Sequence, residues 1–143
     1  LSRYEILLEN YAKTLIIEAK TLQEMLTKDL LPSISAYAGT VASEAASKKA
    51  FLPNLSTASE ESLVLFLSGA YEVLLDGADT LGTTVTEIEA SMSGDTMPDV
   101  ANTCLKELLP LMESLRETAN VAEAKVPDKY LPYPTYDQLL FSV

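Results

Sequence analysis

The stretch LVLFLSGAYEVLLDGADTLGTTVTEIEASM, residues 63–92, decides the fold class. Its apolar and small side chains recur at steps of three and four, at Leu63, Leu67, Ala70, Leu74, Gly77, Leu81, Val85, Ile88 and Met92. Because an α-helix places such positions on one face and rises ~1.5 Å per residue, the stretch predicts a rod of about 45 Å. Hydroxyl and acidic side chains at residues 56–61 predict that this helix begins near Ser59. The rod must bury its apolar face against other helices.

Similar patterns lie on both sides of this central helix. Ser2 and Glu5 have capping-box spacing, and the first stripe runs through Tyr4, Leu8, Tyr11, Leu15, Leu22 and Met25. Pro32 lacks an amide hydrogen, so the first helix should stop or bend there, with Ser33 capping a second segment to about Lys49. A third stripe ends near Lys125 and runs through Ala101, Cys104, Leu108, Leu111, Leu115, Ala119 and Ala122.

These rods predict an all-α fold. We expect an antiparallel three- to four-helix bundle of long helices over residues 1–126, with the first helix broken at Pro32 and the last kinked at Pro110. The loop after Lys49 should be anchored in the core by Phe51 and Leu55. Three glycines of the central helix predict close helix crossings or local bending, at Gly69, Gly77 and Gly82.

Residues 127–143 form an extended tail of a different character. Its prolines oppose helix formation, and its aromatic side chains are too apolar for a solvated terminus. The tail should therefore dock on the bundle or on another domain or subunit. The docking candidates are Tyr130, Pro132, Tyr133, Pro134, Tyr136, Leu139, Leu140 and Phe141.

The composition narrows the possible functions. A net charge of −11 opposes nucleic-acid binding. The chain has no His and one Cys, Cys104, whose place in the third stripe indicates a buried thiol. The acidic series Glu72, Asp76 and Asp79 is typical of a solvated face, with a basic partner surface as the alternative to that reading. We expect no catalytic, cofactor or metal residue in this chain, and we expect a cytoplasmic protein without a membrane segment.

The tail also carries a family resemblance. LPYPTYDQLLF, residues 131–141, resembles the terminal Trp-Pro-(Phe or Tyr)-Pro-Thr-Tyr-Gly-Asp-Leu-Leu-Phe of type III glutamine synthetases. SRYEILLENY, residues 2–11, followed by Ile17-Glu-Ala, is similar to the start of that family's helical C-terminal region. The tail departs from the family pattern at two places. This chain has Leu131 before its first proline, where the pattern has an aromatic residue, and it has Asp137 and Gln138 where the pattern has Gly-Asp.

The resemblance implies a parent enzyme that ligates ammonia to glutamate with ATP and Mg²⁺ or Mn²⁺. It also implies that the catalytic residues precede Leu1, so that this chain is a non-catalytic C-terminal domain that supports folding and oligomer assembly. Its partners would be the catalytic domain of the same chain and neighbouring subunits of a homo-oligomer. The alternative is a free-standing acidic helical bundle that acts as an interaction or sensor module.

Overall fold

The structure, a computed structural model, describes residues 3–92 and 97–133. Its elements are α1 (Arg3–Met25), the π-helical turn η1 (Leu26–Leu30), α2 (Leu31–Phe51), α3 (Ala58–Ser91), α4 (Met97–Thr103), a second π-helical turn η2 (Cys104–Leu108), α5 (Leu109–Lys125) and the 3-10 turn η3 (Asp128–Tyr130). The described residues contain no strand, and the expected all-α bundle is confirmed.

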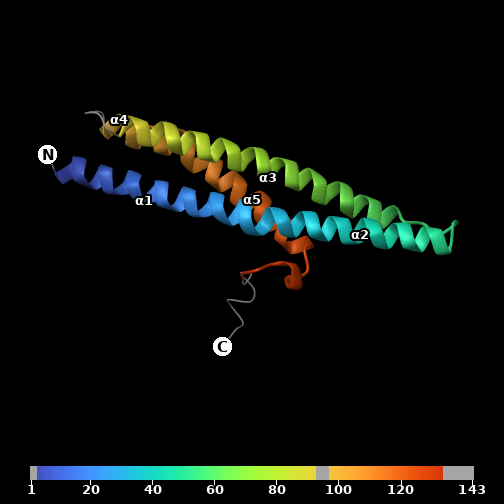
Figure 1. Ribbon diagram of the computed structural model, residues 1–143. Helices are drawn as coiled ribbons and strands as arrows, with labels where there is room; N and C mark the ends of the chain where they lie inside the picture. Colours follow the sequence, from blue (N-terminus) through green and yellow to red (C-terminus); the bar gives the residue numbers. More distant parts are fainter. Residues whose placement is uncertain (1–2, 93–96, 134–143) are drawn as a thin grey trace.

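The helices form three rods (Figure 1). α1, η1 and α2 make the first rod, α3 returns antiparallel to it, and α4, η2 and α5 make the third rod, which runs in the direction of the first. The third rod is shorter, so α2 and α3 continue beyond the end of α5 as a two-helix arm. Among the described residues, no helix combines the length and the apolar character needed to cross a membrane.

The core lies along the axis where the three rods meet. It is built from the apolar faces of all of them, and its largest fully buried side chains are Leu26, Leu30, Ile34, Leu67, Leu74, Leu81, Cys104, Leu108 and Met112. The central stripe is confirmed, because Leu67, Ala70, Leu74, Leu81, Val85 and Ile88 are all buried. Polar links between the described parts of the first two rods include the ion pairs Lys20–Glu89 at 2.9 Å and Lys48–Glu60 at 3.6 Å, and a hydrogen bond from Gln23 Nε2 to the carbonyl oxygen of Ala78 at 3.1 Å.

Both interior prolines follow a π-helical turn. The helix does not stop at Pro32: the amide of Leu31 donates to the carbonyl oxygen of Leu26, five residues back, and helix continues through the proline. The same arrangement precedes Pro110, with the amide of Leu109 donating to the oxygen of Cys104. The two sites share a short sequence repeat, KDLLP at residues 28–32 and KELLP at residues 106–110. The wider turn accommodates a ring that would otherwise clash with the carbonyl group one turn earlier.

The π-helical turns also keep the buried face in register. Buried side chains pass through each turn at steps of four, at Leu22, Leu26, Leu30 and Ile34 in the first rod and at Val100, Cys104, Leu108 and Met112 in the third. In a regular α-helix, twelve residues at roughly 100° each would rotate the last side chain about 120° from the first. A π turn holds one extra residue, which reduces that rotation to about 20°. The turns therefore correct the drift of a four-residue pattern.

The buried face of α1 differs from the predicted stripe. Tyr4 is 68% exposed and Tyr11 is exposed as well, while the buried side chains are Ala12, Leu15, Ile16, Ala19 and Leu22. The observed face is rotated by roughly 60° from the predicted one. The predicted stripe was wrong at its N-terminal end, because the small Ala12 and Ala19 allow neighbouring helices to approach where the tyrosine rings do not.

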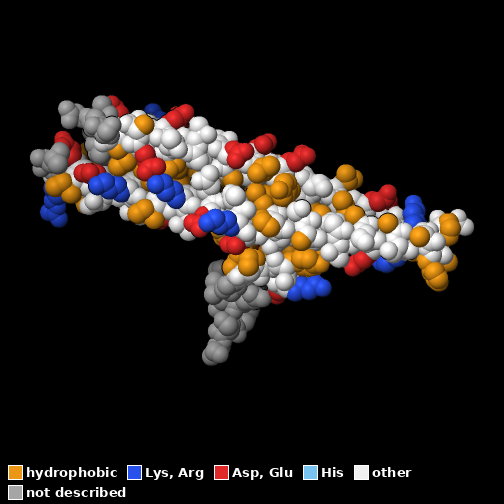
Figure 2. Space-filling model, viewed as in Figure 1, with side chains coloured by type: hydrophobic (Ala, Val, Ile, Leu, Met, Phe, Trp, Pro, Cys, Tyr) orange, Lys and Arg blue, Asp and Glu red, His pale blue; other side chains and the backbone are white. Residues whose placement is uncertain are grey.

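The turn between α2 and α3 also differs from the prediction. Phe51 is 83% exposed, and Leu52 and Leu55 are exposed with it, so the predicted anchoring of this loop by Phe51 and Leu55 was wrong. Figure 2 shows hydrophobic side chains at the right-hand end of the molecule, where Figure 1 shows the turn between α2 and α3. They project because the third rod ends before it reaches them (Figure 1).

The three glycines of α3 fall into two groups. A Cβ atom at Gly77 would collide with the side chain of Leu115 on α5, and one at Gly82 would collide with Gln23 on α1. Both glycines therefore mark the close crossings that the sequence predicts. At Gly69 a Cβ atom would meet nothing within 4 Å. The predicted close crossing at Gly69 is absent within the described chain.

Candidate docking site of the C-terminal segment

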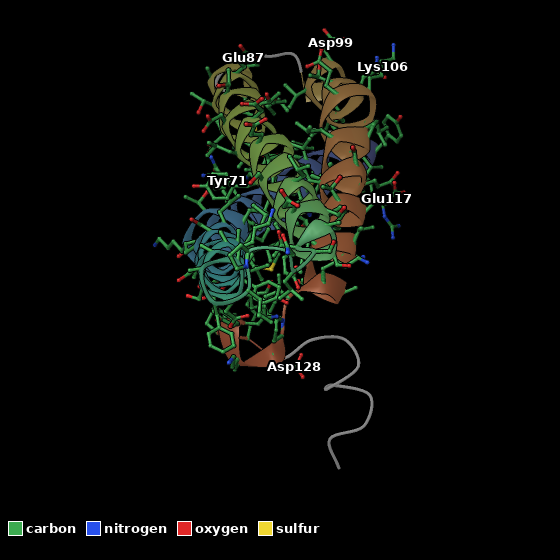
Figure 3. All side chains as sticks on the ribbon, turned by 90° about the vertical axis from the view of Figure 1, so that its right-hand side faces the viewer. Tyr71, Glu87, Asp99, Lys106, Glu117 and Asp128 are labelled. Carbon is green, nitrogen blue, oxygen red and sulfur yellow. The ribbon has the colours of Figure 1, made fainter. Side chains whose placement is uncertain are left out.

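The segment after α5 folds back onto the bundle. Val126 and Pro127 are extended, and Asp128–Tyr130 form a single 3-10 turn, closed by a hydrogen bond from the amide of Leu131 to the oxygen of Asp128 at 3.0 Å. Val126 and Leu131 are buried members of the hydrophobic core, and they lie on either side of this turn. In Figure 3 the segment lies at the lower edge of the bundle, where Asp128 is labelled.

Tyr130 joins the segment to α2. Its ring packs against Tyr37, with 5.3 Å between the ring centroids and a tilt of 53°. Its hydroxyl group donates to Thr40 Oγ1 at 3.0 Å, and that threonine in turn donates to the carbonyl oxygen of Ala36 at 3.1 Å. The ammonium group of Lys129 lies 5.4 Å from the centroid of the Tyr130 ring, on its face. Tyr130 thus has both an apolar and a polar contact with the same helix.

Ser33 forms the second link between the segment and the first rod. Its side chain is buried, and its Oγ lies 2.5 Å from the carbonyl oxygen of Tyr130 and 2.7 Å from that of Asp29. One hydroxyl group has one proton, so it is shared between the two carbonyl groups. The predicted role of Ser33 as a helix cap was wrong, because helix runs continuously through η1 and α2.

Tyr133 joins the segment to α5. Its hydroxyl group donates to Glu123 Oε1 at 2.7 Å. Burial is the largest cause that raises the pKa of Tyr133, and the hydrogen bond and the negative charges of Glu123 and Asp29 raise it further. The phenol group therefore keeps its proton, and with it the hydrogen bond, at pH values where exposed tyrosines ionise.

This shift predicts loosening of the segment at high pH. A raised folded-state pKa contributes stability that is complete below the unfolded-state pKa of about 10 and is lost as the pH rises toward the folded-state value. We expect the ultraviolet absorbance of tyrosinate to show one tyrosine that ionises later than the others. Tyr133→Phe should remove that late step and leave the rest of the titration unchanged. A wild-type titration in which all tyrosines ionise together near pH 10 would contradict the prediction.

The structure places three of the eight docking candidates. Tyr130 and Tyr133 contact the bundle as described, whereas Pro132 is exposed. The other five lie outside the described residues: Pro134, Tyr136, Leu139, Leu140 and Phe141. The bundle side of the site consists of Ser33, Tyr37, Thr40 and Glu123, none of which the sequence singled out for this role. No local sequence signal identifies the partners of Tyr130, because Ser33 and Thr40 lie 97 and 90 residues away from it.

The remaining polar and reactive groups fit a structural role. Cys104 is fully buried, and burial raises the pKa of its thiol group, which keeps it in the unreactive protonated form. The side chains of Glu72, Asp76 and Asp79 are exposed, as predicted for a solvated face. Within the described ranges, no three or more His, Cys, Asp or Glu side chains are grouped in a way that could hold a metal ion.

Comparisons with known proteins place these features in a family context. Residues 1–49 match the family model for the glutamine synthetase C-terminal domain. The chain is 36% identical to a glutamine synthetase of Butyrivibrio fibrisolvens over 99% of its own length, and 26% identical to a type-3 glutamine synthetase of Dictyostelium discoideum over 98%. It spans about a fifth of the length of these relatives, 20% and 19% respectively. No solved structure matches the chain significantly. The resemblance to type III glutamine synthetases is confirmed.

Proposed function

We propose that this chain, a glutamine synthetase C-terminal domain by its similarity to that family, is a non-catalytic helical part of a longer enzyme and supports its folding and oligomer assembly. The main support is the way the similarity is distributed. It extends over 98–99% of this chain but only about a fifth of each relative. The remaining four-fifths of such a polypeptide has ample room for the active site.

The character of the bundle agrees with this assignment. Cys104 is buried and protonated, and the side chains of Glu72, Asp76 and Asp79 on α3 are exposed. In the proposal, the ligation of ammonia to glutamate, the ATP and the Mg²⁺ or Mn²⁺ ions all belong to the preceding catalytic region of a cytoplasmic enzyme. The partners of this domain are that region and neighbouring subunits of a homo-oligomer.

The bundle and the tail have separate tasks in this proposal. Residues 1–126 form the brace, and residues 127–143 close its core and then extend to dock on the rest of the enzyme. The contacts of Tyr130, Leu131 and Tyr133 support the closing task. The docking task falls to Pro134, Tyr136, Leu139, Leu140 and Phe141, whose side chains are too apolar to leave in solvent.

The test has two arms. The coding sequence upstream of Leu1 should encode several hundred residues of a glutamine synthetase, and an enzyme shortened to end before Leu1 should lose its assembled size in analytical ultracentrifugation. The separate domain should form no glutamine from glutamate, ammonia, ATP and magnesium. Normal assembly and full activity of the shortened enzyme would overturn the proposed role.

One observation favours a second candidate, a free-standing interaction module for a basic partner. Residues 50–105 include nine acidic side chains and no basic one, and Figure 2 shows acidic side chains along α3. A start codon immediately before Leu1 would favour this candidate over the first.

A further inference from the structure

An apolar groove runs along the outer side of the bundle between α3 and α5. It has a volume of about 590 Å³, and its lining includes Leu65, Gly69 and Val73 of α3 and Glu117 and Val121 of α5. Three of these side chains are large, apolar and mostly uncovered: Leu65 is 74% exposed, Val73 55% and Val121 52%. Figure 3 shows α3 and α5 side by side, with Glu117 on the outer side of α5 and Tyr71 on the opposite side of α3. Adjacent exposed apolar side chains of this kind mark an interaction surface.

Gly69 lines this groove, and none of the described residues comes within 4 Å of the position that its Cβ atom would occupy. A glycine in a helix interior costs up to about 1 kcal/mol relative to alanine. Gly77 and Gly82 have a local reason, because a Cβ atom there would collide with another helix. At Gly69 there is open space where the Cβ atom would lie. A helix of another part of the protein, crossing closely over Gly69, would give this glycine the same reason.

The charge around the groove specifies the occupant further. α3 has seven carboxylate groups and no basic side chain. Val73 is followed on the same face by Asp76, three residues on, and α5 contributes Glu117 to the lining. Within the described residues, the structure shows no ion pair for Asp76 or Glu117. With a net charge of −11, a second copy of the chain would be repelled from this surface.

We propose that this groove is the docking site for an amphipathic helix from the rest of the glutamine synthetase polypeptide, with a small residue at the crossing over Gly69 and Lys or Arg beside Asp76 and Glu117. This inference rests on the proposed function, which places such a polypeptide next to the domain. The helix has two neighbours already in place, α3 and α5, and completes a local three-helix packing. In this proposal, the groove is the surface through which the domain contacts the rest of the enzyme.

A matched pair of cysteine variants tests the coverage of the groove in the full-length enzyme. Val121→Cys lies in the groove, and Asn120→Cys lies next to it on α5, exposed and turned roughly 100° away. Within this chain the native Cys104 is buried, and labelling at positions 120 and 121 is read from the α5 peptide by mass spectrometry, so other cysteines of the enzyme do not interfere. We expect maleimide to label Val121→Cys about tenfold or more slowly than Asn120→Cys, because a covered thiol reacts only when the interface opens. Equal rates would overturn the proposal.

A second pair tests the helix crossing. Gly69→Leu fills the groove floor, and Gly39→Leu on α2 is the control, because a Cβ atom there also meets nothing within 4 Å. At both positions the added Cβ atom has open space around it within the described domain. Combined with Val121→Cys, Gly69→Leu should restore labelling to the rate of Asn120→Cys, whereas Gly39→Leu should leave it slow. Slow labelling in both double variants would overturn the crossing over Gly69, and slow labelling that disappears on dilution would overturn it in favour of a second copy.

Charge reversal tests whether the docked helix places Lys or Arg beside Asp76. The outcomes also separate this inference from the proposed function. Asp76→Lys should speed the labelling of Val121→Cys, whereas Asp79→Lys, which lies roughly 60° further from the groove within the same acidic series, should have a much smaller effect. Equal effects of the two reversals would contradict Lys or Arg side chains beside Asp76. If the groove tests fail but the enzyme still requires this domain for assembly, only the proposed docking in the groove is overturned. An enzyme that assembles without the domain would overturn the proposed function.

Discussion

Deleting Asp76 from the middle of α3 is expected to unfold the protein. Its side chain is exposed, so the loss of its own contacts matters little. The deletion instead rotates the rest of the helix by roughly 100° relative to the first part. This rotation turns Ala78, Leu81, Val85 and Ile88 out of the core. At roughly 1.5–3 kcal/mol for each large apolar side chain, together with the polar groups brought inside, the loss is comparable to the whole stability of a small domain.

Deleting Thr27 from η1 is expected to have a much smaller effect. Thr27 is also exposed, but the π turn already holds one residue more than a regular helical turn. Removing one residue converts the turn to an α-helical one and leaves Leu22 and Ile34 on the same face. The remaining cost is that of Pro32 in a regular helix, about 3 kcal/mol, and Pro32→Ala should recover most of it.

Circular dichroism and thermal melting of the three variants measure this contrast. The Asp76 deletion should show no cooperative melting transition, the Thr27 deletion a lowered one, and the Thr27 deletion with Pro32→Ala a transition close to that of the wild-type protein. If both single deletions unfold the chain equally, the π turn does not act as a register correction.

The same register argument explains what the sequence predicted well. In α3 the apolar positions mix steps of three and four, with at most two steps of four in succession, which matches a regular α-helix, and the prediction of its buried face was confirmed. In the other two rods, three steps of four in succession and the repeated LLP sequence were the signals of a π turn. Proline alone predicts a break or a kink, and only proline together with a drifting apolar pattern predicts a wider turn that keeps helix on both sides.

Other features depended on contacts that spacing does not determine. In α1, the predicted stripe and the observed face both contain Leu15 and Leu22, and only the close approach of neighbouring helices to Ala12 and Ala19 selects between them. The exposure of Phe51 follows from the length of the third rod, which the α2–α3 turn does not encode. Tyr130 and Tyr133 were recognisable as aromatic anchors, but Ser33 and Thr40, the partners of Tyr130, are distant from it in sequence.

Two truncations separate the two tasks of the C-terminal segment. An enzyme that ends at Val126 lacks Tyr130, Leu131 and Tyr133, and so loses the burial of Leu131, the ring contact with Tyr37 and the hydrogen bonds to α2 and α5. One buried leucine contributes about 2–5 kcal/mol and each hydrogen bond about 1 kcal/mol. We therefore expect this truncation to destabilise the bundle by several kcal/mol and to prevent assembly.

An enzyme that ends at Tyr133 keeps every one of these contacts and lacks only residues 134–143. We expect its bundle to melt at the wild-type temperature, while its assembled size in analytical ultracentrifugation falls because the apolar end of the tail is missing. Tyr136→Ser together with Phe141→Ser, in the full-length enzyme, should reproduce that loss of assembly without shortening the chain. Normal assembly of the enzyme ending at Tyr133 would assign the tail entirely to closure of the bundle core. A fall in melting temperature of this truncation would instead show that residues 134–143 pack on the bundle itself, because no contact made by residues 127–133 has been removed.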